Sequence, residues 1–265
     1  MRLFVEGVGI VGPGLNGWQT SRAILAGKAP YVAMPTLLTA SDLLPAAERR
    51  RTGTPVKLAL AAGCEAFANA GRDAALTATV LTSSGGDGDN VHHICETLAV
   101  AVLEVSPTRF HNSVHNAAAG YWNIAVHSRE PSTSLCGHDS SFAAGLLEAM
   151  TLAVIDDTPV LLVAYDTDYP EPLHSKRPIP DTLGVALVIS PQKSARSVAR
   201  LTLEHDEFLT TAGAGVMDHA ALEFLRQTIP AARALPLLQA IAMHRVGPVV
   251  LTYLEDTQLA VGVRF

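Results

Sequence analysis

Short apolar runs separated by segments with helical spacing make up most of the first 190 residues. Three runs read as buried strands, at 77–82, 160–165 and 183–189. The last two are nearly continuous in apolar residues, and the first combines apolar residues with threonine. Apolar spacing predicts helices at 18–26, 56–70, 90–102, 113–127 and 141–155. Buried strands alternating with helices indicate an α/β protein whose mainly parallel sheet is covered on both faces.

The pattern changes after residue 190. Residues 200–204 read as a strand, 215–228 as a helix, and 248–254 with 258–263 as the two strands of a hairpin. No motif anchors these elements. We therefore expect two parts, residues 1–190 and residues 191–265, with the second packing on the first.

A short strand that turns sharply into an apolar helix, at 130–149, is the segment around which the chain is organised. Such a turn lifts one side chain above the sheet and surrounds it with free N–H groups, so an enzyme of this architecture carries its nucleophile there. A serine is also placed to cap the first amides of the helix. The elbow consists of Gly137, His138, Asp139, Ser140 and Ser141.

The charge composition argues against a nucleic-acid-binding protein. The chain has 19 Lys and Arg against 25 Asp and Glu, a net charge of −6, and only 17% charged residues among 265. Nucleic-acid binding requires a clustered basic excess and is not expected. The one basic run is Arg49, Arg50 and Arg51, which we interpret as a solvated loop or as a contact for an acidic carrier protein or phosphate.

Cysteine usage and hydropathy indicate a cytoplasmic protein. Cys64, Cys95 and Cys136 have no paired spacing, which argues against a disulfide framework or a structural zinc site. The first residues alternate as a strand and lack the regions of a signal peptide. No run of about 18 apolar residues could span a membrane. We expect no cofactor.

One glycine motif has the spacing of a dinucleotide-binding fingerprint. Gly7, Gly9 and Gly12 fit it, but Pro13 and Gly14 follow where the helix should begin. We therefore do not expect nucleotide binding at these glycines.

Two further groups of residues give only weak evidence for a metal site or a catalytic triad. His111 and His115 stand four residues apart, as on a metal-binding helix, but the glutamate of a zinc protease motif is missing between them, so no metal site is expected. Cys136, His138 and Asp139 offer the residue types of a catalytic triad. Working triads are assembled from distant segments, and on a strand Asp139 would point away from the other two.

The elbow resembles that of the β-ketoacyl synthases, in which Pro-Ser precedes a strand and Thr-Ala-Cys then begins the helix. Pro131 and Ser132 match Pro-Ser, and the family's cysteine, seven residues after the serine, falls on Asp139. The nearest thiol, Cys136, comes three residues earlier, where we expect the buried end of the strand. The resemblance therefore implies an elbow that has lost its nucleophile.

Upstream segments extend this resemblance to about residues 1–190. Residues 106–125 are similar to the family's Ser-Pro, aromatic, Asn-x-x-Ala-Gly segment, 82–88 to its Ser-x-Gly-Gly strand end, and 7–14 and 49–51 to its opening strand and Arg-rich loop. The chain most resembles the short chain-length-factor subunits of bacterial aryl polyene clusters. The resemblance implies a thiolase-like (βαβαβαββ) fold with an abbreviated second half.

Function follows from the resemblance as an expectation. Condensation needs a thiolate and two histidines, and the family's His-Gly-Thr and Gly-His motifs do not occur around His205, His219 or His244. The resemblance implies a non-condensing chain-length factor in polyketide-like fatty acid biosynthesis, which pairs with a catalytic β-ketoacyl synthase and meets the acyl carrier protein through that partner. Residues expected at the interface and acyl tunnel are Phe110, His111, Val114, His115 and Asn116.

Two alternatives remain open at this point. One is an acyltransferase or thioesterase-like enzyme that uses Cys136 with His138. The other is a homodimeric acyl-binding scaffold without a synthase partner.

Overall fold

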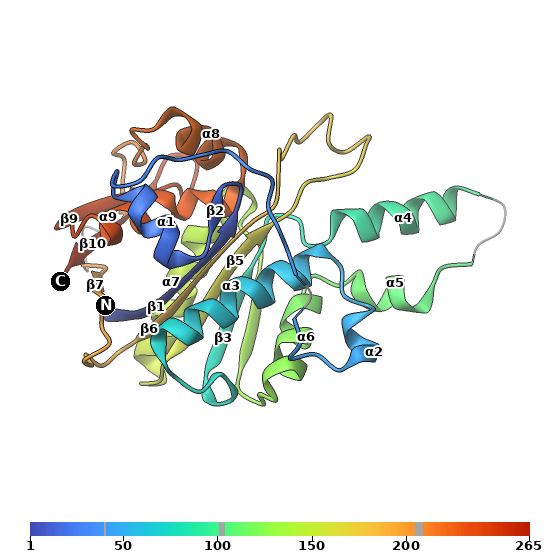
Figure 1. Cartoon of the computed structure of the whole chain (residues 1–265), viewed down its shortest axis with the longest axis horizontal. Helices are drawn as coiled ribbons and strands as arrows, with labels where there is room; N and C mark the ends of the chain where they lie inside the picture. Colours follow the sequence, from blue (N-terminus) through green and yellow to red (C-terminus); the bar gives the residue numbers. More distant parts are fainter. Residues whose placement is uncertain (40, 101–103, 205–208) are drawn as a thin grey trace.

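A single mixed sheet forms the centre of the computed structural model, which describes residues 1–39, 41–100, 104–204 and 209–265 (Figure 1). Within these residues the strands pair in the order β4-β3-β5-β6-β1-β7-β10-β8, with β2 on β1 and β9 on β10. The strands are β1 (Arg2–Gly12), β2 (Leu15–Asn16), β3 (Ala78–Thr82), β4 (Ser132–Leu135), β5 (Val160–Asp166), β6 (Leu183–Ser190), β7 (Ala199–Thr202), β8 (Leu209–Thr210), β9 (Gly247–Leu251) and β10 (Gln258–Arg264).

Strand directions differ between the two parts of the sheet. Strands β4, β3 and β5 pair in parallel, and β6 is antiparallel to both β5 and β1, so four of the first five strands in the sheet order point the same way. Beyond β1 every described pairing is antiparallel. The expected α/β sheet is therefore found, with β4, β3, β5 and β1 pointing the same way and antiparallel strands completing a mixed sheet. Connections without a helix, as between β5 and β6, return the chain antiparallel.

Helices cover both faces of the sheet, as expected (Figure 1). Helices α3 and α6 pack on one face, and α7 with the 3-10 turn η3 packs on the other. The helical elements are α1 (Trp18–Leu25), α2 (Ala46–Arg49), α3 (Thr54–Ala70), η1 (Ala74–Leu76), α4 (Gly88–Ala99), α5 (Pro107–Asn112), α6 (Ala117–Val126), η2 (His138–Ser140), α7 (Ser141–Ile155), α8 (Ala220–Thr228), η3 (Pro230–Ala234) and α9 (Leu235–Ala242).

Strand β5 is buried along its whole length because it lies under helices on both sides. Leu161 and Val163 belong to the core beneath α3 and α6, whereas Val160 and Leu162 belong to the core beneath α7. Side chains alternate between the two faces of a strand, so a strand with two covered faces needs an unbroken apolar run. The unbroken apolar run at residues 160–165 is the pattern that predicted β5.

The first two glycines of the fingerprint-like motif allow a helix to approach a strand closely. Gly7 and Gly9 both lie within β1, and a Cβ on either would overlap a backbone carbonyl oxygen of α3, from Ala66 or Ala62 respectively. Helix α3 is therefore in near backbone contact with β1, which its small residues permit. The motif has a packing role, and the chain does not turn into a helix at its third glycine.

The predicted helix at 113–127 is wrong in its first turn. Helix α5 ends at Asn112 and α6 begins at Ala117, with a turn between them. The side chain of Asn112 donates to the carbonyl oxygen of Arg51 at 2.7 Å, and the Ser113 hydroxyl donates to that of Phe110 at 2.8 Å. Polar side chains that bond backbone groups in this way compete with helix formation.

Helices α4 and α5 together project from the body as an arm (Figure 1).

Residues after 190 continue the same sheet, because β7 pairs with β1 and β10 with β7. The hairpin of β9 and β10 confirms the prediction at 248–263. Helix α8 begins at Ala220, five residues later than expected, and α9 was not predicted. The boundary between the two parts at residue 190 stays a prediction.

Candidate functional site: an elbow closed by an ion cluster

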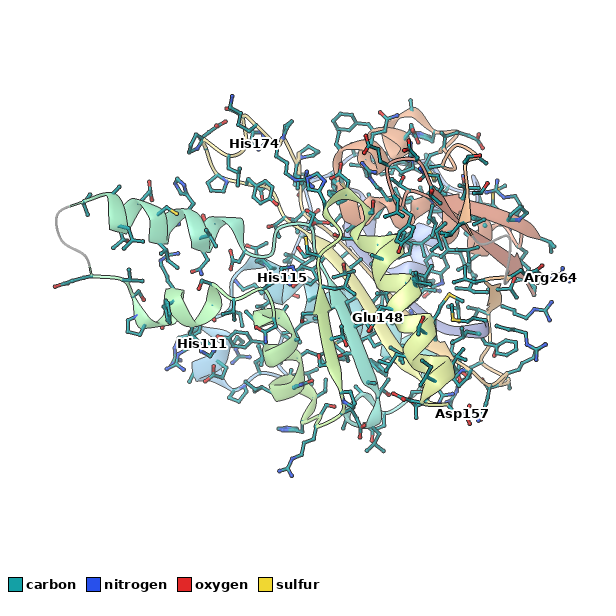
Figure 2. The ribbon with its side chains drawn as sticks, turned by 180° about the vertical axis from the view of Figure 1, so that it is seen from behind. His111, His115, Glu148, Asp157, His174 and Arg264 are labelled. Atoms are coloured by element: carbon teal, nitrogen blue, oxygen red, sulfur yellow. The ribbon has the colours of Figure 1, made fainter. Side chains whose placement is uncertain are left out.

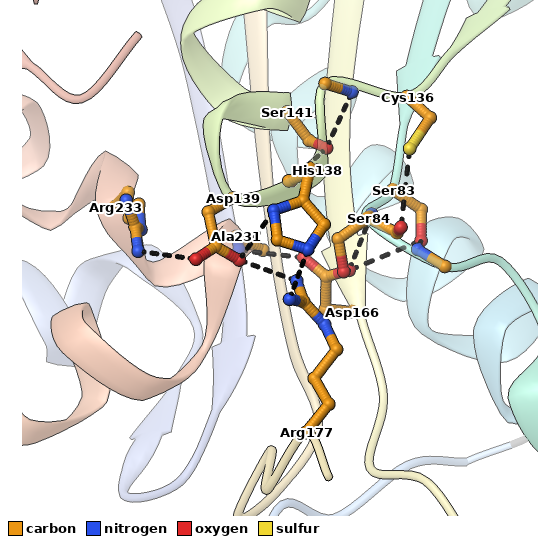
Figure 3. A network of polar contacts seen from close by, with 12 residues as sticks. Ser83, Ser84, Cys136, His138, Asp139, Ser141, Asp166, Arg177, Ala231 and Arg233 are labelled. Atoms are coloured by element: carbon orange, nitrogen blue, oxygen red, sulfur yellow. Dashed lines mark hydrogen bonds and ion pairs between the residues drawn. The ribbon is translucent and has the colours of Figure 1, made fainter. Parts of the chain in front are cut away.

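The elbow joins β4 to α7 through a tightly bonded turn. Ser141 is buried, and its Oγ accepts from the Gly137 amide at 3.1 Å and donates to the His138 carbonyl at 2.7 Å (Figure 3). His138 has φ of 51°, a left-handed conformation that is unusual outside glycine. Ser140 occupies the N-cap position of α7 without a side-chain capping bond. Ser141 therefore stabilises the turn through its hydroxyl, and Ser140 does not cap the helix with its side chain.

Asp139 lies at the centre of an ion cluster (Figure 3). Its Oδ1 accepts from Nη2 of Arg177 at 2.6 Å, and its Oδ2 accepts from Nη2 of Arg233 at 3.0 Å. The Asp139 side chain is 38% exposed, whereas Arg177 and Arg233 are 23% and 18% exposed. Each carboxylate oxygen therefore has its own guanidinium partner.

The two arginines come from segments far from the elbow in sequence. Arg177 lies in the connection between β5 and β6, 38 residues from Asp139, and Arg233 lies in η3, 94 residues away. Sequence reasoning missed both, because neither belongs to a local motif. The only signal was the carboxylate at the nucleophile position, which needs compensating charge once it is partly buried.

The pKa values of the two guanidinium groups shift in opposite directions. Burial alone would lower the pKa of Arg177, but the hydrogen bond and charge interaction with Asp139, together with interactions with Tyr169, outweigh burial and raise the pKa. Burial lowers the pKa of Arg233, and the nearby Asp139 charge opposes that shift. Both groups stay cationic near neutral pH. A carboxylate held by two cations is a poor nucleophile, so Asp139 is not activated for attack.

A second carboxylate lies beneath the elbow. Asp166, at the end of β5, is 2% exposed and accepts from the Ser84 amide at 2.8 Å, the Ser84 hydroxyl at 2.6 Å and the Ala231 amide at 2.8 Å (Figure 3). Burial raises the pKa of Asp166 to about 6, and these hydrogen bonds limit the rise. Asp166 thereby joins the loop after β3 to the start of η3. Sequence reasoning missed this residue too.

Cys136 and His138 have different partners. Cys136 is exposed, which corrects the expected burial at the strand end, and its thiol donates to the Ser84 carbonyl at 3.3 Å. Nε2 of His138 lies 2.7 Å from Nη1 of Arg177, and a guanidinium can only donate. The lone pair that a general base would use is therefore occupied. Among the described contacts, none joins the thiol to the imidazole.

Four of the five residues expected at an acyl tunnel or interface meet on the surface. Phe110, His111, Val114 and Asn116 line an apolar hollow of about 450 Å³ beside α6. Phe110 is 70% and Val114 54% exposed, unusually open for apolar side chains. The other residues that line it are Ala117, Gly120, Tyr121 and Ile124.

The fifth, His115, has its own contact, with Nε2 3.2 Å from the Ser83 carbonyl oxygen. The ring of His111 instead makes an edge contact with that of Tyr121, 6.4 Å between centroids. Because His111 lies in α5 and His115 lies in the turn between α5 and α6, the spacing of a metal-binding helix does not apply to them (Figure 2). The described residues contain no group of three potential metal ligands.

The basic run lies on the surface at the end of α2. Arg49 pairs with Asp42 at 2.6 Å and Arg51 with Glu48 at 3.2 Å, whereas Arg50 is exposed. Exposed pairs of this kind contribute little to stability. A carrier-protein or phosphate contact here stays a prediction.

Comparison with known proteins supports the fold. A chain of the ketosynthase ApeO in complex with its chain length factor ApeC, from Xenorhabdus doucetiae, is 21% identical over 100% of both chains, with a TM-score of 0.73. A chain of the ishigamide ketosynthase/chain length factor is 16% identical, with a TM-score of 0.70 over 100% of this chain and 99% of that one. A chain of the AntDE:AntF complex, a ketosynthase with its acyl-carrier protein, is 12% identical, with a TM-score of 0.74 over 99% of both. The thiolase-like α/β prediction is confirmed.

No curated protein matches this chain. None of the described helices is long and apolar enough to cross a membrane. The model of the β-ketoacyl synthase N-terminal domain matches residues 18–241, most of the chain. The chain therefore belongs to the β-ketoacyl synthase N-terminal domain family.

Proposed function

We propose that this chain is a non-condensing subunit that pairs with a catalytic β-ketoacyl synthase and acts as its chain-length factor, in the biosynthesis of an aryl polyene or a related polyketide-like fatty acid. The observation that carries the proposal is the ion cluster at the elbow. Asp139 stands where the family resemblance implies the acyl-carrying cysteine, and Arg177 and Arg233 occupy both of its oxygens. A carboxylate held in this way cannot carry an acyl chain as a cysteine does by forming a thioester.

The exposed edge of the sheet supports the proposal of a partner. Strand β4 is the end strand in the described sheet order, with β3 as its neighbour. Its outward N–H and C=O groups are free to pair with a strand of another chain. A partner of the same fold, placed about a pseudo-twofold axis, would continue the sheet across the interface.

The apolar hollow supports the proposed effect on chain length. It lies beside α6, which packs against β4, and thus next to the proposed interface. Exposed apolar surface of this kind marks protein contacts or ligand grooves. In the complex, the bulk of Phe110 and Val114 would wall part of the partner's acyl tunnel and limit its length by occlusion. The carrier protein would deliver its acyl chain to the catalytic partner, with Arg50 as an exposed contact.

Co-expression with the ketosynthase encoded beside this chain tests the proposal. We expect a stable one-to-one complex by size-exclusion chromatography with mass analysis, and condensing activity only when the synthase is present. In the complex, Phe110→Ala should lengthen the products, whereas Ile155→Ala, an equally exposed change on α7, should leave them unchanged.

Two results would overturn the proposal. One is condensation of acyl and malonyl carrier-protein substrates by this chain alone. The other is a monomer or homodimer that ignores the synthase, which would favour a homodimeric scaffold. Cys136→Ala separates the remaining alternative, because loss of product in this variant would indicate an enzyme that uses the thiol.

A further inference from the structure

A cavity of about 520 Å³ is lined by residues from near both termini. The two termini lie at the end of the molecule opposite the arm of α4 and α5 (Figure 1). The cavity is formed by the start of β1, the segment that leads into β7, helix α1 and the end of α9. Cavities of 300–1,000 Å³ are typical of small-molecule sites. The elbow does not contribute to it, and the lining residues are Arg2, Phe4, Trp18, Arg22, Lys193, Ser197, Val198, Ala199, Arg200, Ile241, His244 and Phe265.

Positive charge is concentrated in this cavity. Four lining side chains, Arg2, Arg22, Lys193 and Arg200, are cationic, and the lining contributed by the described residues contains no aspartate or glutamate. The whole chain has a net charge of −6, so the average composition does not account for this concentration. Cations gathered without counter-charge in a concave site attract an anion.

Arg200 adds a hydrogen-bonding requirement. Its Nε is buried and has no hydrogen-bond partner within the part of the chain that the structure describes. A buried donor without an acceptor is costly, and each such group in a native protein requires an explanation. An anionic oxygen in the cavity would supply the acceptor. Arg200 lies opposite Phe4 on the paired strands β7 and β1, which fixes its position in the wall.

Aromatic side chains form much of the remaining wall. Trp18 is largely buried, and the rings of His244 and Phe265 pack at 4.8 Å between centroids with 32° between their planes. Flat rings of this kind stack against planar groups, and arginine side chains do so as well. The cavity therefore combines sites for an anion with surfaces for a planar ring.

We propose that this cavity binds a nucleoside diphosphate or a ligand of the same chemistry, with its phosphates on Arg200, Arg22 and Lys193 and its base against the aromatic side chains. The planar fork of arginine matches phosphate oxygens in pairs, and lysine adds a mobile point charge. This site is separate from the Gly7 and Gly9 motif, which packs against α3. The inference does not depend on the proposed partnership with a synthase.

Calorimetric titration of the full chain with ADP, pyrophosphate and adenosine tests this site. We expect ADP to bind most tightly, pyrophosphate more weakly and adenosine weakest, with ADP affinity falling as salt is raised. Arg200→Gln should weaken ADP binding at least tenfold, and Arg22→Gln and Lys193→Gln severalfold each. The control is Lys28→Gln, which makes the same charge change on an exposed side chain just beyond α1 and outside the cavity, and it should leave ADP affinity unchanged.

Three results would overturn the inference. The first is an ADP dissociation constant above about 1 mM at low salt. The second is an equal loss of affinity in Lys28→Gln and Arg22→Gln, which would show a diffuse charge effect. The third is pyrophosphate binding as tight as ADP, which would remove the role of the rings. If Arg200→Gln does not fold, the exposed Arg22 and Lys193 variants decide the test.

Discussion

At the residue scale, Asp139 joins two guanidinium groups that would otherwise face each other without a shared counter-charge. Its carboxylate accepts from Arg177 and Arg233, both less exposed than Asp139 itself. Removing one member of such a cluster leaves partly buried charges unpaired, which costs more than the intact cluster contributes. The arginines therefore depend on Asp139 more strongly than an exposed ion pair would.

Replacing Asp139 with alanine should lower the free energy of unfolding by about 1–2 kcal/mol, less than for a fully buried pair because solvent reaches the cluster. Urea unfolding followed by circular dichroism measures the change. Asp42→Ala serves as the control, since Asp42 pairs with Arg49 while its side chain is 97% exposed, and should cause no measurable loss. Equal losses in the two variants would contradict the role of the cluster.

Asp166 should give stability a distinct pH dependence. Its pKa is about 6 in the folded protein and about 3.9 in an unfolded chain, so the folded state binds its proton more readily. The contribution of Asp166 to the unfolding free energy should therefore fall as pH rises from about 4 to about 6, by up to about 3 kcal/mol, and stay constant above that range.

The measurement compares the wild type with Asp166→Asn, whose side chain does not titrate. The unfolding free energy of the wild type minus that of the variant should be larger at pH 4.5 than at pH 7.5. The variant is expected to be less stable at both values, because an amide nitrogen would face the Ala231 amide or another donor. A difference that does not change with pH would disprove the raised pKa.

At the element scale, the close approach of α3 to β1 is the contact most sensitive to added volume. A single methyl group on Gly9 would overlap the Ala62 carbonyl oxygen, and backbone atoms cannot rotate away as a side chain can. Small-to-large changes at tightly packed positions typically cost 1–3 kcal/mol.

Gly9→Ala should accordingly destabilise the protein by about 2 kcal/mol or more. Gly120→Ala is the matched control, because a Cβ there meets no atom within 4 Å and the residue lies inside α6. In a helix, alanine is preferred over glycine, so the control should be neutral or slightly stabilising. Thermal unfolding separates the two, and an unchanged melting temperature for Gly9→Ala would contradict the packing argument.

The elements show which features the sequence could predict. Strands β3, β5 and β6 and helix α3 follow from apolar pattern and boundary residues. Helix α9 is buried at every position, so it has no polar face to give it a helical period. The break between α5 and α6 depends on a bond from Asn112 to the backbone of Arg51, which no local pattern encodes. Arg177 and Arg233 were not predicted as site residues because their contacts with Asp139 are also not encoded in a local pattern.

At the scale of the whole molecule, the open edge of β4 is where association should occur. In the parallel pairing of β3 with β4, the Pro131 and Leu135 carbonyls accept from β3, so alternate residues direct their backbone groups toward β3. The backbone groups of Ser134 therefore point away from the sheet. They are available to a partner strand.

Ser134→Pro should weaken association with the synthase while leaving the chain folded. Proline removes an outward N–H donor and is tolerated in edge strands. We expect at least a tenfold loss of affinity by titration of the purified subunits, with a melting temperature close to that of the wild type. Ser132→Ala, on the same strand, keeps its backbone donor and is the control. Unchanged affinity of the proline variant would place the interface elsewhere.

The ion cluster also has a topological consequence. One carboxylate fastens the elbow to the connection between β5 and β6 and to η3, so it acts as a non-covalent cross-link between stretches 38 and 94 residues away. Arg177 follows the exposed Lys176 directly, and its contact with Asp139 holds that connection against the elbow. Without the carboxylate, the peptide bond between Lys176 and Arg177 should become more accessible to trypsin in the folded chain.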